Sequence, residues 1–199
     1  MKKLLILFIS LISFLSIQAQ DSEGYFDVSR TVTGKSLRLI QSPNVDIQNN
    51  MIGNLETKKY VAYYNSLGIE TPSKGKKTVK YKIGFLIMDH FDFSIPKNSR
   101  LLIKFKNGQT MTLTTADDNE SDYKRISGLD RYYVSASYVV TDQQLNKIIS
   151  QGISKIRIEA GVRNFDVIPE VDMAKLTKEF KTGIYNRYNK KTDSFTDGF

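Results

Sequence analysis

The chain has 199 residues, with 29 Lys and Arg against 21 Asp and Glu, one His, and neither Cys nor Trp. Without a thiol and with a single imidazole, the sequence excludes a cysteine-nucleophile enzyme, a thiolate zinc centre, a disulfide scaffold and a metal site built on two histidines. What remains is a globular protein for which the sequence predicts no cofactor.

The first 19 residues have the pattern of a secretory signal peptide. Lys2 and Lys3 form a positive start, residues 4–15 are an apolar run, and a short polar stretch ends at Ala19. The apolar stretch over residues 4–17 has 14 residues, fewer than the roughly 20 that a membrane span needs. This favours cleavage after Ala19 over an uncleaved anchor.

We therefore expect an exported protein, periplasmic or secreted, that is peripheral rather than transmembrane once residues 1–19 are removed. The remaining residues 20–199 carry 27 basic and 21 acidic side chains, a formal charge of +6. Their number suits a single domain, with residues 189–199 as a flexible polar tail.

The N-terminal half of this domain predicts strands. Residues 25–32 and 36–41 each favour a short strand, and residues 42–54, rich in Asn, Gln, Pro and Gly, favour a connection. Two longer strands are expected over residues 59–67 and 79–88, because alternate residues of the second are apolar.

A hairpin is expected at Gly108, between apolar strands over residues 101–105 and 111–113. A three-residue loop keeps Ile103 opposite Met111 and so keeps the apolar side chains on one face, whereas a two-residue loop mixes the faces. This register predicts Gly108 at positive φ in a G1 bulge.

Thr141 and Gln144 have the spacing of a capping box, which predicts a helix that ends at Gly152. The strands expected on either side of this helix cover residues 132–140, 153–159 and 163–168.

From Pro169 onward the apolar period becomes helical, and a second helix is expected to end near Tyr188. Strands followed by two helices in the C-terminal half predict an α+β fold. We expect mainly antiparallel sheet rather than a parallel doubly wound sheet.

Residues 100–159 present a particular order of features. They are Leu101-Leu102-Ile103-Lys104-Phe105, a glycine turn, Tyr132-Tyr133-Val134, Thr141 with Gln144-Leu145, and Lys155-Ile156-Arg157-Ile158. In this order, which spans about a third of the chain, the sequence resembles uncharacterised small exported proteins of Gram-negative bacteria. The resemblance implies a shared strand-hairpin-strand-helix-strand core, with no assigned activity and no active site.

His90 is the one side chain whose ordinary pKa is near neutrality. Asp92 could lie beside it and orient it as a general base, whereas Asp89 would point to the other side of a continuous strand. Because the chain has no G-x-S-x-G elbow or comparable nucleophile motif, a structural or solvent-facing histidine is favoured over a catalytic one.

Asp117, Asp118, Glu120 and Asp122 form the densest acidic run, and oxygen clusters of this kind bind hard cations such as Ca²⁺. An EF-hand that starts at either of the first two residues would lack Gly at the sixth position and a carboxylate at the twelfth. A solvated loop is therefore favoured and no metal site is predicted. Paired carboxylates, in this run or around His90, leave open a glycan hydrolase.

Basic side chains concentrate in residues 57–106, where eleven Lys or Arg face three acids. If the strands in this stretch are neighbours, the Lys side chains on their polar faces form one positive surface. The predicted binding residues of this surface are Lys80, Lys82, Lys104, Lys106 and Tyr81. The alternative is a solvated face that only keeps the protein soluble.

Together these features favour a non-catalytic binding or structural module of the cell envelope. The expected partner is an anionic envelope component or another protein, and not nucleic acid, which an exported protein does not ordinarily meet. A glycan hydrolase and an assembly subunit that adds a strand to a partner are the alternatives that the sequence leaves open.

Overall fold

The computed structural model describes residues 25–32, 35–49, 60–126, 129–161 and 163–189. The expected signal peptide and the tail from residue 190 onward lie outside these residues. Most of the described chain is antiparallel β-sheet and its helices all lie in the C-terminal half, which confirms the expected α+β fold. None of the described helices is long and apolar enough to cross a membrane.

The described residues divide into two compact units. One holds the residues up to Pro43 together with Ser66–Lys80, and the other holds Asn44–Asn65 together with the residues from Tyr81 onward. One boundary falls between Pro43 and Asn44, outside the strands. The other two fall inside β4 (Tyr60–Pro72) and β5 (Thr78–Asp89), so that each of these strands contributes to both units.

The first unit is built on the hairpin of β1 (Phe26–Val32) and β2 (Lys35–Gln41), with β2 also pairing the second half of β4. Ion pairs cross between its strands: Arg38 holds the carboxylate of Asp27, and Lys35 Nζ lies 2.7 Å from Glu70. Both strands of the hairpin were expected.

In the second unit, a sheet runs in the order β3 (Val45–Asn49), the first half of β4, β5, β9 (Leu129–Val140) and β8 (Asp122–Ile126). Strand β3 occupies a stretch that was expected to be a connection, and β8 begins at the last residue of the acidic run. Ile47 explains β3, because its fully buried side chain anchors to the core a segment that is polar at three of its five positions.

Helix α2 (Asp142–Gln151) begins and ends as the sequence predicts. The Thr141 hydroxyl accepts from the backbone N–H of Gln144 at 3.2 Å, and the Gln144 side chain accepts from the backbone N–H of Thr141 at 2.9 Å. Gly152 caps the C-terminus at φ 63° and donates its N–H to the Ile148 carbonyl.

The second helical segment consists of α3 (Met173–Phe180), a π-helical turn (Lys181–Tyr185) and α4 (Asn186–Asn189). Its end agrees with the prediction, whereas the π-helical turn was not expected. At its start, the Asp172 carboxylate accepts from the backbone N–H groups of Ala174 and Lys175 at 3.0 and 3.2 Å.

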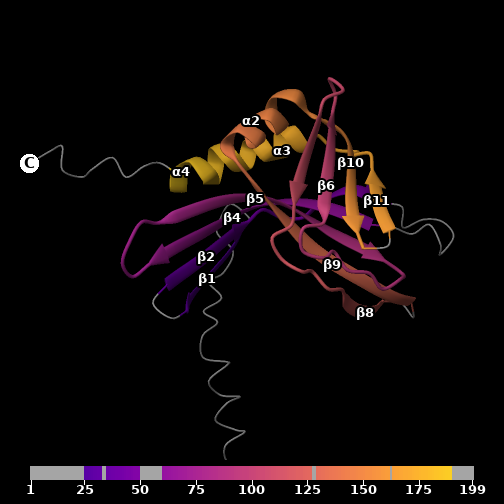
Figure 1. Ribbon diagram of the computed structural model, residues 1–199, viewed down its shortest axis with the longest axis horizontal. Helices are drawn as coiled ribbons and strands as arrows, with labels where there is room; N and C mark the ends of the chain where they lie inside the picture. Colours follow the sequence, from indigo (N-terminus) through magenta and orange to yellow (C-terminus); the bar gives the residue numbers. More distant parts are fainter. Residues whose placement is uncertain (1–24, 33–34, 50–59, 127–128, 162, 190–199) are drawn as a thin grey trace, which may run out of the picture. The chain divides into compact units, whose positions relative to one another are not determined.

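Helix α3 covers one face of the sheet in the second unit (Figure 1). The hydroxyls of Tyr63 and Thr177 lie 2.7 Å apart, and the Tyr81 ring meets the Phe180 ring edge-on at 5.6 Å. Asn65 Oδ1 accepts from the hydroxyls of both Tyr63 and Tyr81 at 2.7 Å. Burial raises the pKa of Tyr63, so its hydroxyl stays protonated and available as a donor.

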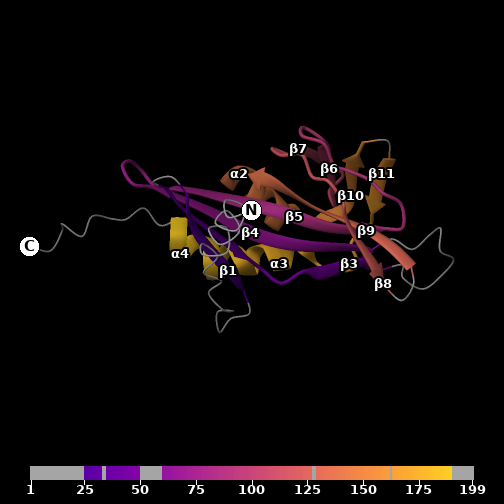
Figure 2. The ribbon, with the colours of Figure 1, turned by 90° about the horizontal axis from the view of Figure 1, so that it is seen from below.

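A separate four-stranded antiparallel sheet has the order β11 (Arg163–Val167), β10 (Ile153–Ala160), β6 (Arg100–Phe105) and β7 (Thr110–Thr114). Figure 2 shows these four strands gathered beside β9. One face of the sheet is buried in the core of the second unit. The side chains on this face include Leu101, Ile103, Phe105, Ile156, Ile158 and Phe165.

The hairpin of β6 and β7 has the register that the sequence predicts. Ile103 lies opposite Met111, and Leu101 lies opposite Leu113. Gly108 has φ 87°, so the three-residue loop and the positive φ of its glycine are confirmed.

Candidate functional site

The solvent side of the four-stranded sheet carries charged side chains from three adjacent strands. They alternate with the buried residues because successive side chains of a strand point to opposite faces. We name this surface the charged face and define it by Arg100 and Lys104 of β6, Lys155, Arg157 and Glu159 of β10, and Asp166 of β11. Four of these residues are basic and two are acidic.

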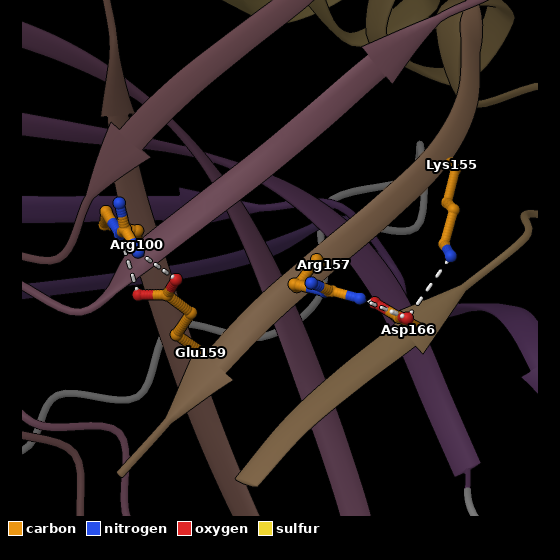
Figure 3. Close-up of polar contacts among 5 residues, drawn as sticks. All are labelled: Arg100, Lys155, Arg157, Glu159 and Asp166. Atoms are coloured by element: carbon orange, nitrogen blue, oxygen red, sulfur yellow. Dashed lines mark hydrogen bonds and ion pairs between the residues drawn. The ribbon is translucent and has the colours of Figure 1, made fainter.

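Two sets of ion pairs order most of the charged face (Figure 3). Arg157 donates from Nε and Nη2 to the two oxygens of Asp166, each at 2.7 Å, and Lys155 Nζ lies 3.2 Å from the same carboxylate. Arg100 forms a second fork on Glu159, at 2.9 and 2.6 Å. Such bidentate pairs fix the guanidinium plane as well as its position.

The ion pairs shift the pKa of both acids. The hydrogen bond from Arg157, supported by the one from Lys155, lowers the pKa of Asp166 to about 2. Arg100 likewise lowers the pKa of Glu159. Both carboxylates therefore stay charged through the neutral range and keep their basic partners occupied.

Lys104 differs from the other basic residues of the charged face. Among the described residues its ammonium has no hydrogen bond or ion pair. The strand register places it opposite Lys155 on β10 and opposite Thr110 on β7. It borders a depression of about 190 Å³ whose other walls include Leu102 and Arg157. The described residues that line the depression include three cations and no acid.

The predicted binding residues do not belong to one sheet. Lys82 lies on β5, between β4 and β9, whereas Lys104 lies on β6, between β10 and β7. Since their strands belong to different sheets, the expected single sheet face is not formed. Lys80 belongs to the other compact unit. Exposed Lys106 follows β6 in the hairpin loop, where its N–H donates to the Gly152 carbonyl at 3.1 Å.

Tyr81 was expected among the binding residues and lies in the core instead. Its ring is 2% exposed, and its hydroxyl donates to Asn65. The alternation of β5 explains this correction, because Tyr81 shares its side of the strand with Ile83 and Phe85, while Lys82 lies on the other side.

Sequence reasoning missed that Lys155 and Arg157 complete a basic surface around Lys104. The polar side of each strand could be recognised separately, from the alternation of charged and apolar residues. Their assembly depends on the pairing of β10 with β6, between segments that are far apart in the sequence. A single sequence carries no direct signal for such a pairing.

His90 lies beside Asp89. Strand β5 ends at Asp89, whose fully buried carboxylate lies 2.8 Å from His90 Nδ1 and accepts from Arg163 Nη1 at 2.9 Å. The ring nitrogen is within ion-pair distance but is not aligned for a hydrogen bond. Asp92 instead accepts from the Ser121 hydroxyl. The carboxylate beside His90 is that of Asp89, because the strand ends at Asp89 instead of continuing through His90.

Arg163 accounts for the buried carboxylate of Asp89. It donates to that carboxylate and places its guanidinium 5.0 Å from the centre of the Phe91 ring. A buried carboxylate needs such a partner. The cluster thus has a structural explanation.

The acidic run is held in a folded loop. Asp118 Oδ1 accepts from the backbone N–H of Lys97 at 2.8 Å, and the Asp117 carbonyl accepts from Thr115 and Asn119. In the part of the chain that the structure describes, no group of three or more metal-ligating side chains could hold an ion. The geometry therefore gives no support to a calcium site.

Comparison of the chain with protein-family models, with curated proteins and with solved structures finds no match in any of the three. The resemblance noted over residues 100–159 stays a prediction, and the functional argument is based on the geometry of the chain.

Proposed function

We propose that this protein is a non-catalytic binding module of the cell envelope and that its charged face binds an anionic group of an envelope component or a partner protein. The observation that carries the proposal is the depression between Lys104 and Lys155. Lys104, Lys155 and Arg157 all line it, and no acid is among the described residues of its lining. An anion bound there would reduce the repulsion between neighbouring cations.

The ion pair between Arg157 and Asp166 supports the same chemistry. Arg157 already holds a carboxylate through two hydrogen bonds of 2.7 Å, a geometry that suits a phosphate equally well. An incoming anion would share or replace Asp166 at this guanidinium, while Lys104 adds a cation that no described acid neutralises.

The test is sedimentation with vesicles of phosphatidylglycerol and phosphatidylcholine at increasing salt. The wild type should sediment with the anionic vesicles at low salt and leave them as salt rises, because exposed charges are screened. Lys104→Glu/Lys155→Glu should lose most of this binding. Lys97→Glu/Lys124→Glu changes the net charge equally at exposed positions outside the charged face and serves as the matched control.

Equal loss of binding in both variants would show that net charge alone determines adsorption, and the proposed face would be wrong. The same conclusion would follow if the Lys104→Glu/Lys155→Glu variant bound as tightly as the wild type. Circular dichroism of both variants establishes that they are folded.

A strand-adding role is a second candidate, favoured by the order of the four-stranded sheet. Strand β11 (Arg163–Val167) stands at the end of that order, and in the described chain β10 is its one strand neighbour. A partner strand could add there through main-chain hydrogen bonds. Asn164→Pro should then prevent a partner protein from binding to β11, since proline removes a backbone hydrogen-bond donor from this strand. Unchanged binding of the partner protein by this variant would exclude β11 as the site of strand addition.

A further inference from the structure

A cavity in the second unit has a volume of about 510 Å³ and shares no described lining residue with the depression on the charged face. Three segments form its walls: residues 92–94 after β5, residues 120–121 before β8, and the turn that joins β10 to β11 at residues 160–161. This volume is in the range of pockets that hold small molecules.

The walls are fixed by contacts that do not depend on a ligand. Ile95 and Asn119 exchange backbone hydrogen bonds of 2.8 and 3.0 Å, which tie the first two segments together. Phe93, 7% exposed, packs on Phe165 of β11 with ring centres 4.9 Å apart. Gly161 turns the chain at φ 54°. The cavity is therefore formed before any ligand enters.

The described ionisable groups that line the cavity all have the same sign of charge. Among the described residues that line it, the ionisable side chains are the carboxylates of Asp92 and Glu120, the hydroxyls belong to Ser94 and Ser121, and none is basic. The Ser121 hydroxyl donates to Asp92 and orients that carboxylate. Charged carboxylates only accept hydrogen bonds, so the ligand that suits this cavity brings donors and positive charge.

We propose that the cavity binds a small organic amine, with its ammonium group between the carboxylates of Asp92 and Glu120 and its remaining polar atoms toward the two serines. This inference is independent of the anion-binding role of the charged face, because the two surfaces have no lining residue in common. An amino sugar and the side chain of a lysine both offer this chemistry.

Isothermal titration with three probes tests the proposal. Glucosamine and glucose share a ring and differ in the ammonium group, and n-butylamine reproduces the end of a lysine side chain. Glucosamine should bind saturably, and glucose at least about tenfold more weakly, because the charge-assisted hydrogen bond is lost. The affinity of n-butylamine relative to glucosamine then distinguishes the lysine-type ligand from the amino sugar.

Glu120→Gln removes one charge with little change of shape and should weaken glucosamine binding about tenfold or more. Asp117→Asn is the matched control, since Asp117 lies in the same loop, is exposed, and does not line the cavity. Equal affinity for glucose and glucosamine would overturn the proposal in favour of a neutral sugar site. It would also be overturned if no probe bound, or if the Glu120→Gln variant and its control bound glucosamine equally well.

Discussion

Tyr64 lies directly across Gly84 in the sheet of the second unit: a Cβ atom added to Gly84 would come 2.0 Å from Cζ of Tyr64 and 2.5 Å from its hydroxyl oxygen. The ring thus extends from β4 across β5, and its hydroxyl reaches Ser135 of β9 at 2.9 Å. The absence of a side chain at Gly84 is what allows this crossing.

Gly84→Ala should therefore destabilise the protein by about 1–3 kcal/mol, the usual cost of overpacking a core. Urea unfolding of the wild type and the variant measures the loss. The control is the same substitution in a Tyr64→Leu background, where the space across β5 is free and the cost should shrink. An equal cost in both backgrounds would show that the Tyr64 ring is not the cause.

Substitution of Gly108 tests the effect of backbone strain rather than of side-chain packing. No atom lies within 4 Å of a Cβ added there, but φ is 87°. Gly108→Val should cost about 1–2 kcal/mol of unfolding free energy through backbone strain, whereas Gly108→Asn should cost less, because Asn tolerates positive φ. Urea unfolding again provides the measurement, and two variants as stable as the wild type would contradict the prediction.

Features determined by local chemistry could be predicted from the sequence. The hairpin register at Gly108 follows from keeping Ile103 and Met111 on one face, and helix α2 follows from Thr141 and Gln144. Strand β3 could not be predicted, because three of its five residues are polar and resemble a loop, and its pairing with β4 and the burial of Ile47 appear only in the folded chain.

The division into two units and the charged face depend on long-range pairing. Two of the three unit boundaries fall inside β4 and β5, where no linker composition marks them. The third, between Pro43 and Asn44, lies in the stretch that its Asn, Gln, Pro and Gly content predicted as a connection. Lys104 was correctly expected to be exposed on the polar side of a strand. It was also expected to lie on one surface with Lys82, because the two residues are close in the chain. In the structure its cross-strand neighbour is Lys155 instead.

Asn65 should be essential to the core beneath α3. Its Oδ1 accepts from the hydroxyls of Tyr63 and Tyr81, and all three residues are buried. Asn65→Ala removes an acceptor from two buried donors and should cost about 2–4 kcal/mol of unfolding free energy. Asn164→Ala, at an exposed position on β11, is the control and should cost little. Similar losses in both would contradict the role of the buried network.

The depressed pKa of Asp166 predicts the direction of a pH effect. Its pKa is about 2 in the folded chain against an ordinary value of 3.8, so its stabilising contribution is present above pH 4 and is lost as the pH falls toward 2. Because the ion pairs are exposed, this contribution should stay below about 1 kcal/mol. The unfolding free energy of the wild type should exceed that of Asp166→Asn at pH 5, and the gap should narrow at pH 2. A constant gap would contradict the linkage.

Asp166 forms ion pairs with the cations that the proposed anion would bind. Removing the charge of Asp166 is therefore a direct test of the charged face. Asp166→Asn frees Arg157 and Lys155 without changing the size of the side chain. Binding to phosphatidylglycerol vesicles should become roughly two- to fivefold tighter, the equivalent of one exposed ion pair. Asp117→Asn raises the net charge by the same amount in a loop that does not belong to this face, and should leave the affinity near that of the wild type. An equal gain of vesicle affinity in the two variants would show that net charge causes the effect. Weaker binding of Asp166→Asn than of the wild type would mean that Asp166 holds Arg157 in its binding position and does not compete with the anion for Arg157.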